Sequence, residues 1–308
     1  MEQVETAGAA AARDDQRPTW RRIVDFPLVA LIIAVVLFLV ANAAALFVIK
    51  NLLPPMDRNL GSLVKATINI GFALALYKFA IVRLGEHQHD DLPLAGAPKG
   101  FTVGFLIGFG IFAAVVGIAA LLDVYNVAGP GNTRDLVVAF IGLGLVPAFM
   151  EELLFRGIMF RWIEELGGSW TALLLTSLLF GLSHIVNPNA TWFSSAAIAI
   201  EAGLLLGAAY MLTRNLWLPI GLHAGWNFTQ GEVFDVPVSG IDQHGLVTAT
   251  LSGPTLLSGG AFGLEASVIG LGATTAVGLW FLVRAIREGE LVQPWWVRRR
   301  LARSDPVA

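Results

Sequence analysis

The chain contains no cysteine and few charged residues. Of its 308 residues, only 14% are Asp, Glu, Lys or Arg, whereas 56% are apolar. The absence of cysteine excludes disulfides, thiolate metal sites and a cysteine nucleophile. A soluble domain usually has about a quarter charged residues. Together with a mean hydropathy of +0.69, this composition indicates a polytopic membrane protein whose apolar surface faces lipid.

Several common hydrolase motifs are absent as well. The sequence has no helical H-E-x-x-H zinc motif, no G-x-S-x-G and no pair of intramembrane aspartates for an aspartyl mechanism. Ser183 directly precedes His184, so we expect the two side chains to point to different faces of a helix and to make a poor nucleophile–base pair. The polar residues of the chain therefore need another explanation.

Eight apolar segments are predicted to span the membrane. They are residues 26–49, 59–83, 100–122, 135–160, 169–187, 191–212, 215–230 and 264–284. The expected fold is an all-α, polytopic membrane bundle of about eight transmembrane helices. The expected domains are a disordered cytoplasmic tail over residues 1–22, a transmembrane helical domain over 23–287 and a basic cytoplasmic tail over 288–308.

Arginine is concentrated near both ends of the chain, whereas segment 231–263 has no Lys or Arg. An even number of spans puts both termini on the same side, and the positive-inside rule makes that side cytoplasmic. The expected location is the cell (inner) membrane, which the chain crosses several times. The Gly- and Ser-rich segment 231–263 is expected to lie outside, as a loop, a lid or a re-entrant element.

Three apolar segments carry polar residues that a helix facing lipid does not need. These residues are Glu151, Glu152 and Arg156 in the fourth span, Phe180 with His184 in the fifth, and His223 with Asn227 in the seventh. A charged side chain at bilayer depth costs at least a few kcal/mol, so the two adjacent carboxylates need a reason. Pro147 lacks a backbone donor, which leaves the Leu143 carbonyl without its helical partner and allows a kink beside them.

Residue counts predict that the three segments converge. Gly167-Gly168 forms a turn, and both Glu151 and His184 lie about 16 residues from it, roughly 24 Å into the bilayer. His223 is about nine residues beyond the turn at 213–215, within reach if the helices tilt. Glu201 lies on the sixth span and is expected at the margin of the same cavity. The pairs Gly104/Gly108 and Gly203/Gly207 predict close helix packing.

Helical spacing separates the two carboxylates. Glu152 and Arg156 are four residues apart in the order that favours an ion pair, so we expect them to form a structural pair. Glu151 points about 100° away and has no cation on its own face. One carboxylate, two imidazoles and one amide in a cavity suit hydrolysis of an acyl bond: Glu151 would take a proton from water, and His223 and Asn227 would stabilise the oxyanion.

The role of the histidines has two alternatives at this point. His184 either shares the activation of water with Glu151 or binds a metal, and His223 is either an oxyanion donor or a second metal ligand. In the metal alternative, Glu151, His184 and His223 would bind Zn²⁺ and leave one position open for water. In the other, a glutamate mechanism runs without metal. His87, His89 and His244 are expected to be solvated loop residues.

The three motifs in this order, each within an apolar helix, resemble the CPBP intramembrane protease family. They read E-E-x-x-x-R from Glu151, F-x-x-x-H from Phe180 and H-x-x-x-N from His223, and with the surrounding helices they cover about residues 135–230. The family includes type II CAAX prenyl endopeptidases and bacteriocin-processing or immunity proteins, the "Abi" group. The stretch from His223 to Gly263 is similar to a bacterial subgroup of it.

The resemblance implies cleavage of a peptide bond within or near the membrane. It assigns water activation to Glu151 and His184, the oxyanion to His223 and Asn227, and site ordering to Glu152, Arg156 and Phe180. The implied partners are the lipid bilayer and a membrane-associated protein or peptide, prenylated or otherwise lipophilic, with no nucleic acid.

Two other functions stay open. The first is a non-enzymatic membrane scaffold or bacteriocin-immunity protein that retains the polar core for folding. The second is a transporter, against which the lack of an inverted repeat argues.

Overall fold

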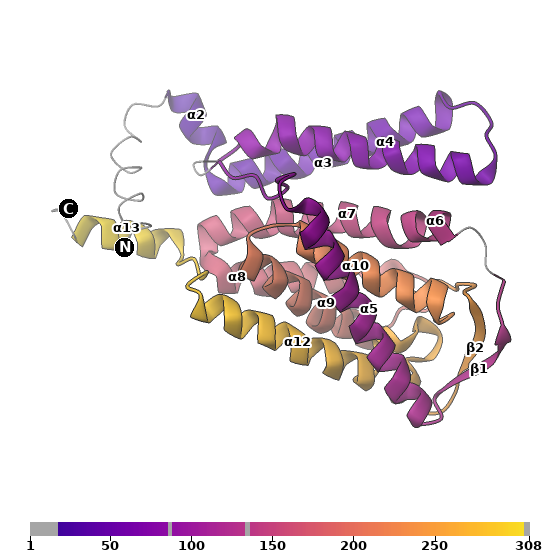
Figure 1. The fold of residues 1–308 in the computed structure, drawn as a ribbon. Coiled ribbons are helices and arrows are strands. Elements are labelled where there is room, and N and C mark those ends of the chain that lie inside the picture. The colour runs from indigo at the N-terminus through magenta and orange to yellow at the C-terminus, as the bar shows by residue number, and fades with distance from the viewer. Residues whose placement is uncertain (1–17, 86–87, 133–135, 305–308) are drawn as a thin grey trace.

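The chain forms a bundle of long helices in the computed structural model (Figure 1), which describes residues 18–85, 88–132 and 136–304. The N-terminal part contains α2 (Thr19–Val24), α3 (Pro27–Asn51), α4 (Arg58–Phe79), the short turn η2 (Ile81–Arg83), α5 (Ala97–Leu121) and strand β1 (Tyr125–Pro130). The central part contains α6 (Leu136–Ala139), η3 (Phe140–Leu145), α7 (Val146–Glu152), η4 (Leu153–Phe160), α8 (Arg161–Ser183), η5 (His184–Val186) and α9 (Trp192–Thr213). The last part contains α10 (Trp217–Phe228), η6 (Thr229–Val233), β2 (Val247–Leu251), α11 (Thr255–Ser258), η7 (Gly260–Phe262), η8 (Leu264–Ala266), α12 (Val268–Arg287) and α13 (Trp295–Ser304).

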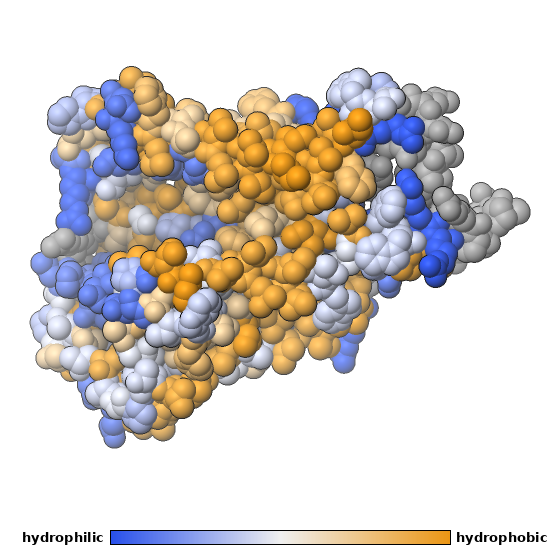
Figure 2. Space-filling model, turned by 180° about the vertical axis from the view of Figure 1, so that it is seen from behind, coloured by the Kyte–Doolittle hydropathy of each residue, from blue (hydrophilic) through white to orange (hydrophobic). Residues whose placement is uncertain are grey.

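Six helical stretches of the described chain are long and apolar enough to cross a membrane. They are Pro27–Asn51, Arg58–Arg83, Ala97–Leu121, Leu136–Val186, Trp192–Thr213 and Val268–Arg287. Many of their side chains face outward, and Figure 2 shows an apolar band across the middle of one face with hydrophilic residues toward its ends. The polytopic membrane bundle is therefore confirmed.

The predicted number of eight spans is not confirmed. The stretch Leu136–Val186 leaves helical geometry at Gly168, with φ 80° and ψ 169°, so it consists of two helical legs that meet at the expected glycine turn. The predicted span 215–230 corresponds to α10 and η6, which are short and almost wholly buried. Sequence hydropathy does not distinguish a helix buried among other helices from one that faces lipid.

Both described ends of the chain contain a helix. Residues 19–22 of the predicted N-terminal tail belong to α2, and the predicted C-terminal tail includes α13. Residues 1–17 and 305–308 lie outside the described residues. Figure 1 shows α2 and α13 at the same end of the bundle, as an even number of crossings requires.

The segment 231–263 contains a strand that the sequence analysis did not predict. Its β2 pairs antiparallel with β1, from Tyr125 opposite Leu251 to Pro130 opposite Val247. The Asp235 carboxylate accepts hydrogen bonds from the backbone amides of Gly245 (3.1 Å) and Ala249 (2.9 Å), which fixes the return of the segment onto the bundle. Strand pairing over this sequence distance leaves no local signal.

Glycines set the spacing between α5 and α10. A Cβ on Gly108 would lie 2.1 Å from the Leu222 carbonyl oxygen, and a Cβ on Gly221 would lie 2.1 Å from that of Phe101. Gly104 of α5 and Gly225 of α10 make equally close approaches. The predicted Gly203/Gly207 pair packs against α8, where a Cβ on Gly203 would overlap Ser177. Small residues thus hold α10, with His223 on it, directly against α5.

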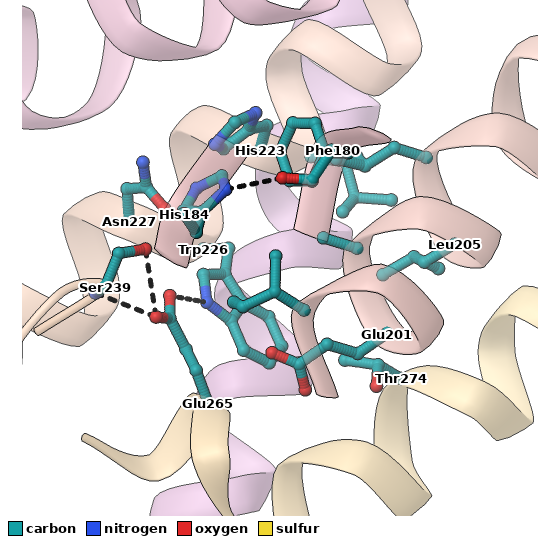
Figure 3. Close-up of a pocket in the computed structure, with 14 residues that line it drawn as sticks. Phe180, His184, Glu201, Leu205, His223, Trp226, Asn227, Ser239, Glu265 and Thr274 are labelled. Carbon is teal, nitrogen blue, oxygen red and sulfur yellow. Dashed lines mark hydrogen bonds between the residues drawn. The ribbon is translucent and has the colours of Figure 1, made fainter. Parts of the chain in front are cut away.

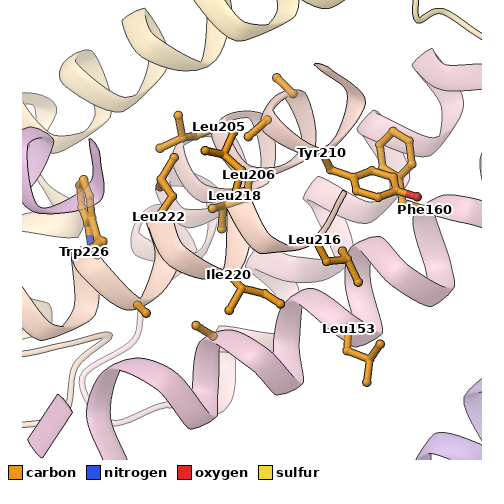
Figure 4. Packing of buried hydrophobic residues seen from close by; sticks show 14 of the residues in the cluster. Leu153, Phe160, Leu205, Leu206, Tyr210, Leu216, Leu218, Ile220, Leu222 and Trp226 are labelled. Carbon is orange, nitrogen blue, oxygen red and sulfur yellow. The ribbon is translucent and has the colours of Figure 1, made fainter. Parts of the chain in front are cut away.

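The apolar core continues from this contact between α9, α10 and the α7–η4 region. Figure 4 shows Leu205, Leu206 and Tyr210 of α9 on one side and Leu218, Ile220 and Leu222 on the other, all of them buried. Because both helices that flank the polar site are packed in this way, the site residues have a rigid support.

Candidate active site

A cavity with about 410 Å³ of empty space, partly open to the surroundings, lies between α8, α9, α10 and η8 (Figure 3). Phe180, His184, His223 and Asn227 all line it, so the structure brings two of the three sequence motifs together. Glu201 also lines the cavity, in agreement with its expected position. The remaining motif, with Glu151 and Glu152, joins it through contacts with His223.

Glu152 binds two cation-forming side chains with a single oxygen. Its Oε1 accepts a hydrogen bond from Arg156 Nη1 at 2.8 Å and lies 3.0 Å from His223 Nδ1. The predicted Glu152–Arg156 ion pair is confirmed, and both side chains are fully buried. Since a carboxylate in an ion pair only accepts, Nδ1 of His223 carries the hydrogen, and Nε2 is the nitrogen left for a ligand.

Arg156 connects this pair to the neighbouring helix α9. Its Nη2 donates to the Ala202 carbonyl at 3.1 Å, and its guanidinium carbon lies 4.8 Å from the centre of the Phe180 ring. The Phe180 ring also lies 4.8 Å from the His184 ring and 6.1 Å from the His223 ring. Arg156 therefore contacts Glu152, which binds His223, and the Phe180 ring lies against both histidine rings.

His184 is anchored in a similar way. Its Nδ1 lies 2.8 Å from the Phe180 carbonyl oxygen, which can only accept, so Nδ1 carries the hydrogen and Nε2 is left for a ligand. The expectation that Ser183 and His184 point apart is wrong, because Ser183 Oγ lies 3.3 Å from Nδ1 at the end of α8, where the helix tightens into η5. Ser183 Oγ itself donates to the Phe180 carbonyl, so it still lacks a base.

Glu151 lies beside His223 on the side away from Glu152. Its Oε2 is 4.0 Å from His223 Nε2, and its side chain is 34% exposed. This oxygen is nevertheless shielded from solvent and has no hydrogen-bond partner among the described residues. A separation of this size between two polar atoms is suited to a bridging water. The two carboxylates thus have separate surroundings, as their helical positions predict.

Asn227 fills the gap that Pro147 creates. The Leu143 carbonyl, which loses its helical donor to the proline, lies 3.4 Å from Asn227 Nδ2. One hydrogen of the amide is therefore used to hold the helix that carries Glu151, and the other stays available at the cavity wall. The predicted irregularity is present, although as the π-helical turn η3 just before Pro147.

The other two π-helical turns also adjoin the motifs. η4 begins directly after Glu152 and contains Arg156, and η6 begins two residues after Asn227. π-turns are rare and occur often at functional sites, where they rotate the following residues relative to an α-helix.

The sequence analysis missed one buried carboxylate of the cavity. Glu265 of η8 accepts from Trp226 Nε1 at 3.1 Å and from the Ser239 amide at 2.8 Å (Figure 3). The sequence did contain a signal for this residue, because Glu265 is an acid in an apolar stretch just after a segment without any Lys or Arg.

The residues do not form a preassembled metal site. Within the described ranges, no group of three or more His, Cys, Asp or Glu side chains is arranged to hold an ion. Glu151 lies 4.0 Å from His223, and His184 lines the same cavity as His223, but the three side chains are not grouped around one point.

The loop histidines differ from one another. His87 lies outside the described residues and His244 is exposed. His89 is not simply solvated, because its Nε2 contacts the Arg214 carbonyl at 3.3 Å and Asp91 at 3.4 Å.

Comparison with known proteins agrees with this site. No curated protein and no solved structure matched the chain. Residues 133–229 match the model of a family described as "Type II CAAX prenyl endopeptidase Rce1-like". The match begins before Glu151 and ends just after Asn227, so it contains all three motifs. The chain therefore carries an Rce1-like type II CAAX prenyl endopeptidase (CPBP) family domain.

Proposed function

We propose that the protein is an intramembrane endopeptidase that hydrolyses a peptide bond in a membrane-associated protein or peptide, prenylated or otherwise lipophilic. The observation that carries the proposal is the unpartnered Oε2 of Glu151, 4.0 Å from the free Nε2 of His223. An acceptor and an imidazole nitrogen at this separation suit a water held between them. The family of the domain supports the same reaction class.

In the proposed mechanism, Glu151 takes a proton from the attacking water, with His184 Nε2 as the second group that exchanges protons with the reacting atoms. In its imidazolium form, His223 donates from Nε2 to the oxyanion while its Nδ1–H stays bound to Glu152, and Asn227 donates its second amide hydrogen. Arg156 and Phe180 position both histidines through the contacts described above. The acting atoms of His184, His223 and Asn227 thus belong to side chains that another polar atom already holds in place.

The test is peptide cleavage by the purified, detergent-solubilised full-length protein, with a fluorogenic peptide library that carries or lacks a farnesyl group. We expect Glu151→Gln to lower kcat by about 10²–10⁴-fold. His223→Ala and Asn227→Ala each remove an oxyanion donor and should lower kcat by about 10²–10³-fold. His244→Ala changes an exposed histidine remote from the cavity and is the matched control.

Two further outcomes decide between the alternatives. Cleavage that persists in Glu151→Gln, His184→Ala and His223→Ala refutes this mechanism, whereas no cleavage of any peptide by the folded wild type favours a membrane scaffold that retains the polar core. Activity that is lost in 1,10-phenanthroline and restored by Zn²⁺ favours the metal alternative, in which Glu151, His184 and His223 move together on binding the ion.

A further inference from the structure

The end of the cavity away from His223 contains two buried carboxylates. Glu201 of α9 is 2% exposed and Glu265 of η8 is 3% exposed. Figure 3 shows the Trp226 ring between the two side chains, with Thr274 of α12 next to Glu201. The two acids interact electrostatically with each other. Neither belongs to the three motifs, and Glu265 lies beyond residues 133–229.

The two carboxylates differ in their partners. Both oxygens of Glu265 are used, Oε1 by Trp226 and Oε2 by the amide and hydroxyl of Ser239. Glu201 Oε2, by contrast, is fully shielded and has no hydrogen-bond partner among the described residues. A buried polar atom without a partner costs about 1–3 kcal/mol, and a charged one costs more. Glu201, which lines the cavity, thus carries an unsatisfied buried acceptor.

The positive charge around the cavity does not balance these acids. None of the described residues that line it is Lys or Arg. Arg156 and His223 face the carboxylates of Glu152 and Glu151. His184, which interacts electrostatically with Glu265, carries at most one positive charge. One cation is therefore missing when both carboxylates are ionised.

A primary ammonium group fits this end of the cavity. It offers three donors in a compact head at the end of an apolar stem. Glu201 Oε2 supplies an acceptor, and the indole of Trp226 supplies an aromatic surface that attracts cations. A metal ion fits less well, since the described residues hold no group of three or more metal-binding side chains.

We propose that the space between Glu201, Glu265 and Trp226 is a specificity subsite for a lysine-type ammonium group of the substrate, with Glu201 as its counter-charge. The inference rests on the proposed peptidase function. A peptide whose scissile bond lies at Glu151 and His223 extends along the same cavity, so a nearby side chain enters this subsite. Glu201 is then a specificity-determining residue, and Glu265 positions Trp226 and the Ser239 loop around it.

The first experiment measures binding without cleavage. Thermal unfolding of the full-length protein is followed in n-butylammonium chloride and, at equal concentration and ionic strength, in n-butanol with NaCl. The expected result is a higher Tm in butylammonium than in butanol for the wild type, a difference that is absent in Glu201→Gln. Glu232→Gln is the matched control, because Glu232 is also buried with an unpartnered oxygen but does not line the cavity, and it should keep the difference.

The second experiment measures specificity. Peptide pairs from the cleavage assay differ only in lysine or norleucine at one position near the scissile bond. For one of the peptide positions tested, the wild type and Glu232→Gln should cleave the lysine peptide with a kcat/KM at least about tenfold higher than that of the norleucine peptide. A charge-assisted hydrogen bond predicts a difference of this size. The ratio should fall to near one in Glu201→Gln and in Glu201→Leu, the second variant in case the amide is poorly tolerated.

The two hypotheses fail in different ways. If no peptide is cleaved but butylammonium stabilises the protein only when Glu201 is present, the subsite stands and the peptidase proposal fails. If peptides are cleaved with no preference for lysine at any position, and butylammonium acts equally on wild type and Glu201→Gln, the subsite is refuted.

Discussion

At the scale of single residues, the main finding is that three polar side chains of the candidate site are each fixed by a contact to one of their polar atoms. His223 is fixed by Glu152, His184 by the Phe180 carbonyl, and Asn227 by the Leu143 carbonyl. In each case one polar atom is anchored and another is left free. Sequence spacing predicted which residues belong to the site but assigned Glu152 only to Arg156, because helical periodicity describes contacts within one helix.

Glu152 should be essential for stability as well as for ordering the site. We expect Glu152→Gln to lower the free energy of unfolding by about 3–5 kcal/mol, because it leaves the buried Arg156 without a counter-charge. The double variant Glu152→Gln/Arg156→Met should recover part of this loss, as a double-mutant cycle measured by unfolding in detergent will show. Additive losses in the double variant would contradict a coupled pair.

Asp91 should make stability depend on pH. It is a buried residue of the connection before α5, accepts from the hydroxyls of Tyr77 of α4 at 2.8 Å and Tyr210 of α9 at 2.9 Å, and lies 3.5 Å from Arg161. Burial raises the pKa of the Asp91 carboxyl, and Arg161 opposes the rise. Its stabilising contribution is therefore complete below the unfolded pKa of about 3.9 and is lost as the pH rises through the folded value.

The measurement is Tm as a function of pH. In Asp91→Asn, the decline of Tm above about pH 4 should be shallower than in the wild type. The control is Asp90→Asn, which removes a neighbouring carboxylate that is 39% exposed and paired with Lys78. Equal slopes in Asp91→Asn and wild type would show that Asp91 does not titrate in this range.

At the scale of elements, α10 is the helix on which the site depends. It is short and buried, carries both His223 and Asn227, and lies against α5 without intervening side chains at its glycines. Its position therefore follows from close backbone contact more than from its own hydropathy. The sequence analysis identified Gly104 and Gly108 as packing residues but missed their partners, Gly221 and Gly225.

An added methyl group at this contact should displace α10. We expect Gly108→Ala to lower the free energy of unfolding by about 1–3 kcal/mol, because its Cβ would overlap the Leu222 carbonyl and the helices must separate. Gly110→Ala on the same helix has no atom within 4 Å of the added Cβ and should be neutral or slightly stabilising. Cleavage activity should follow stability, and equal effects of both variants would refute the packing role.

At the scale of the whole molecule, the helices form a membrane bundle whose two described ends lie together, with the β1–β2 sheet at the opposite end (Figure 1). The arginines beside α2 and α12 and the lack of basic residues in 231–263 predict which end faces the cytoplasm.

The absence of cysteine makes this orientation directly testable. We expect Ser252→Cys, next to β2, to react with a membrane-impermeant maleimide in intact cells. Glu288→Cys, after α12, should react only once the membrane is permeabilised. Both positions are exposed. Labelling of Glu288→Cys in intact cells would reverse the predicted topology.

The sequence by itself determined the membrane class, the order of the motifs that the family match contains, and most residues of the candidate site. It did so because an apolar helix leaves few reasons for a polar residue, so those that occur are informative. Periodicity also predicted the Glu152–Arg156 pair and the turn at Gly168, since both depend on residues near one another in the chain.

Only the tertiary structure decided how these residues meet. It brings Glu152 to His223 across 71 positions, Asn227 to Leu143 across 84, and Glu265 to Trp226 across 39. It also pairs β1 with β2 and buries α10 among the other helices, which hydropathy alone does not show. Such contacts depend on helix rotation, on π-turns and on the close approach of backbones at glycines, which are properties of packed helices and not of any local pattern.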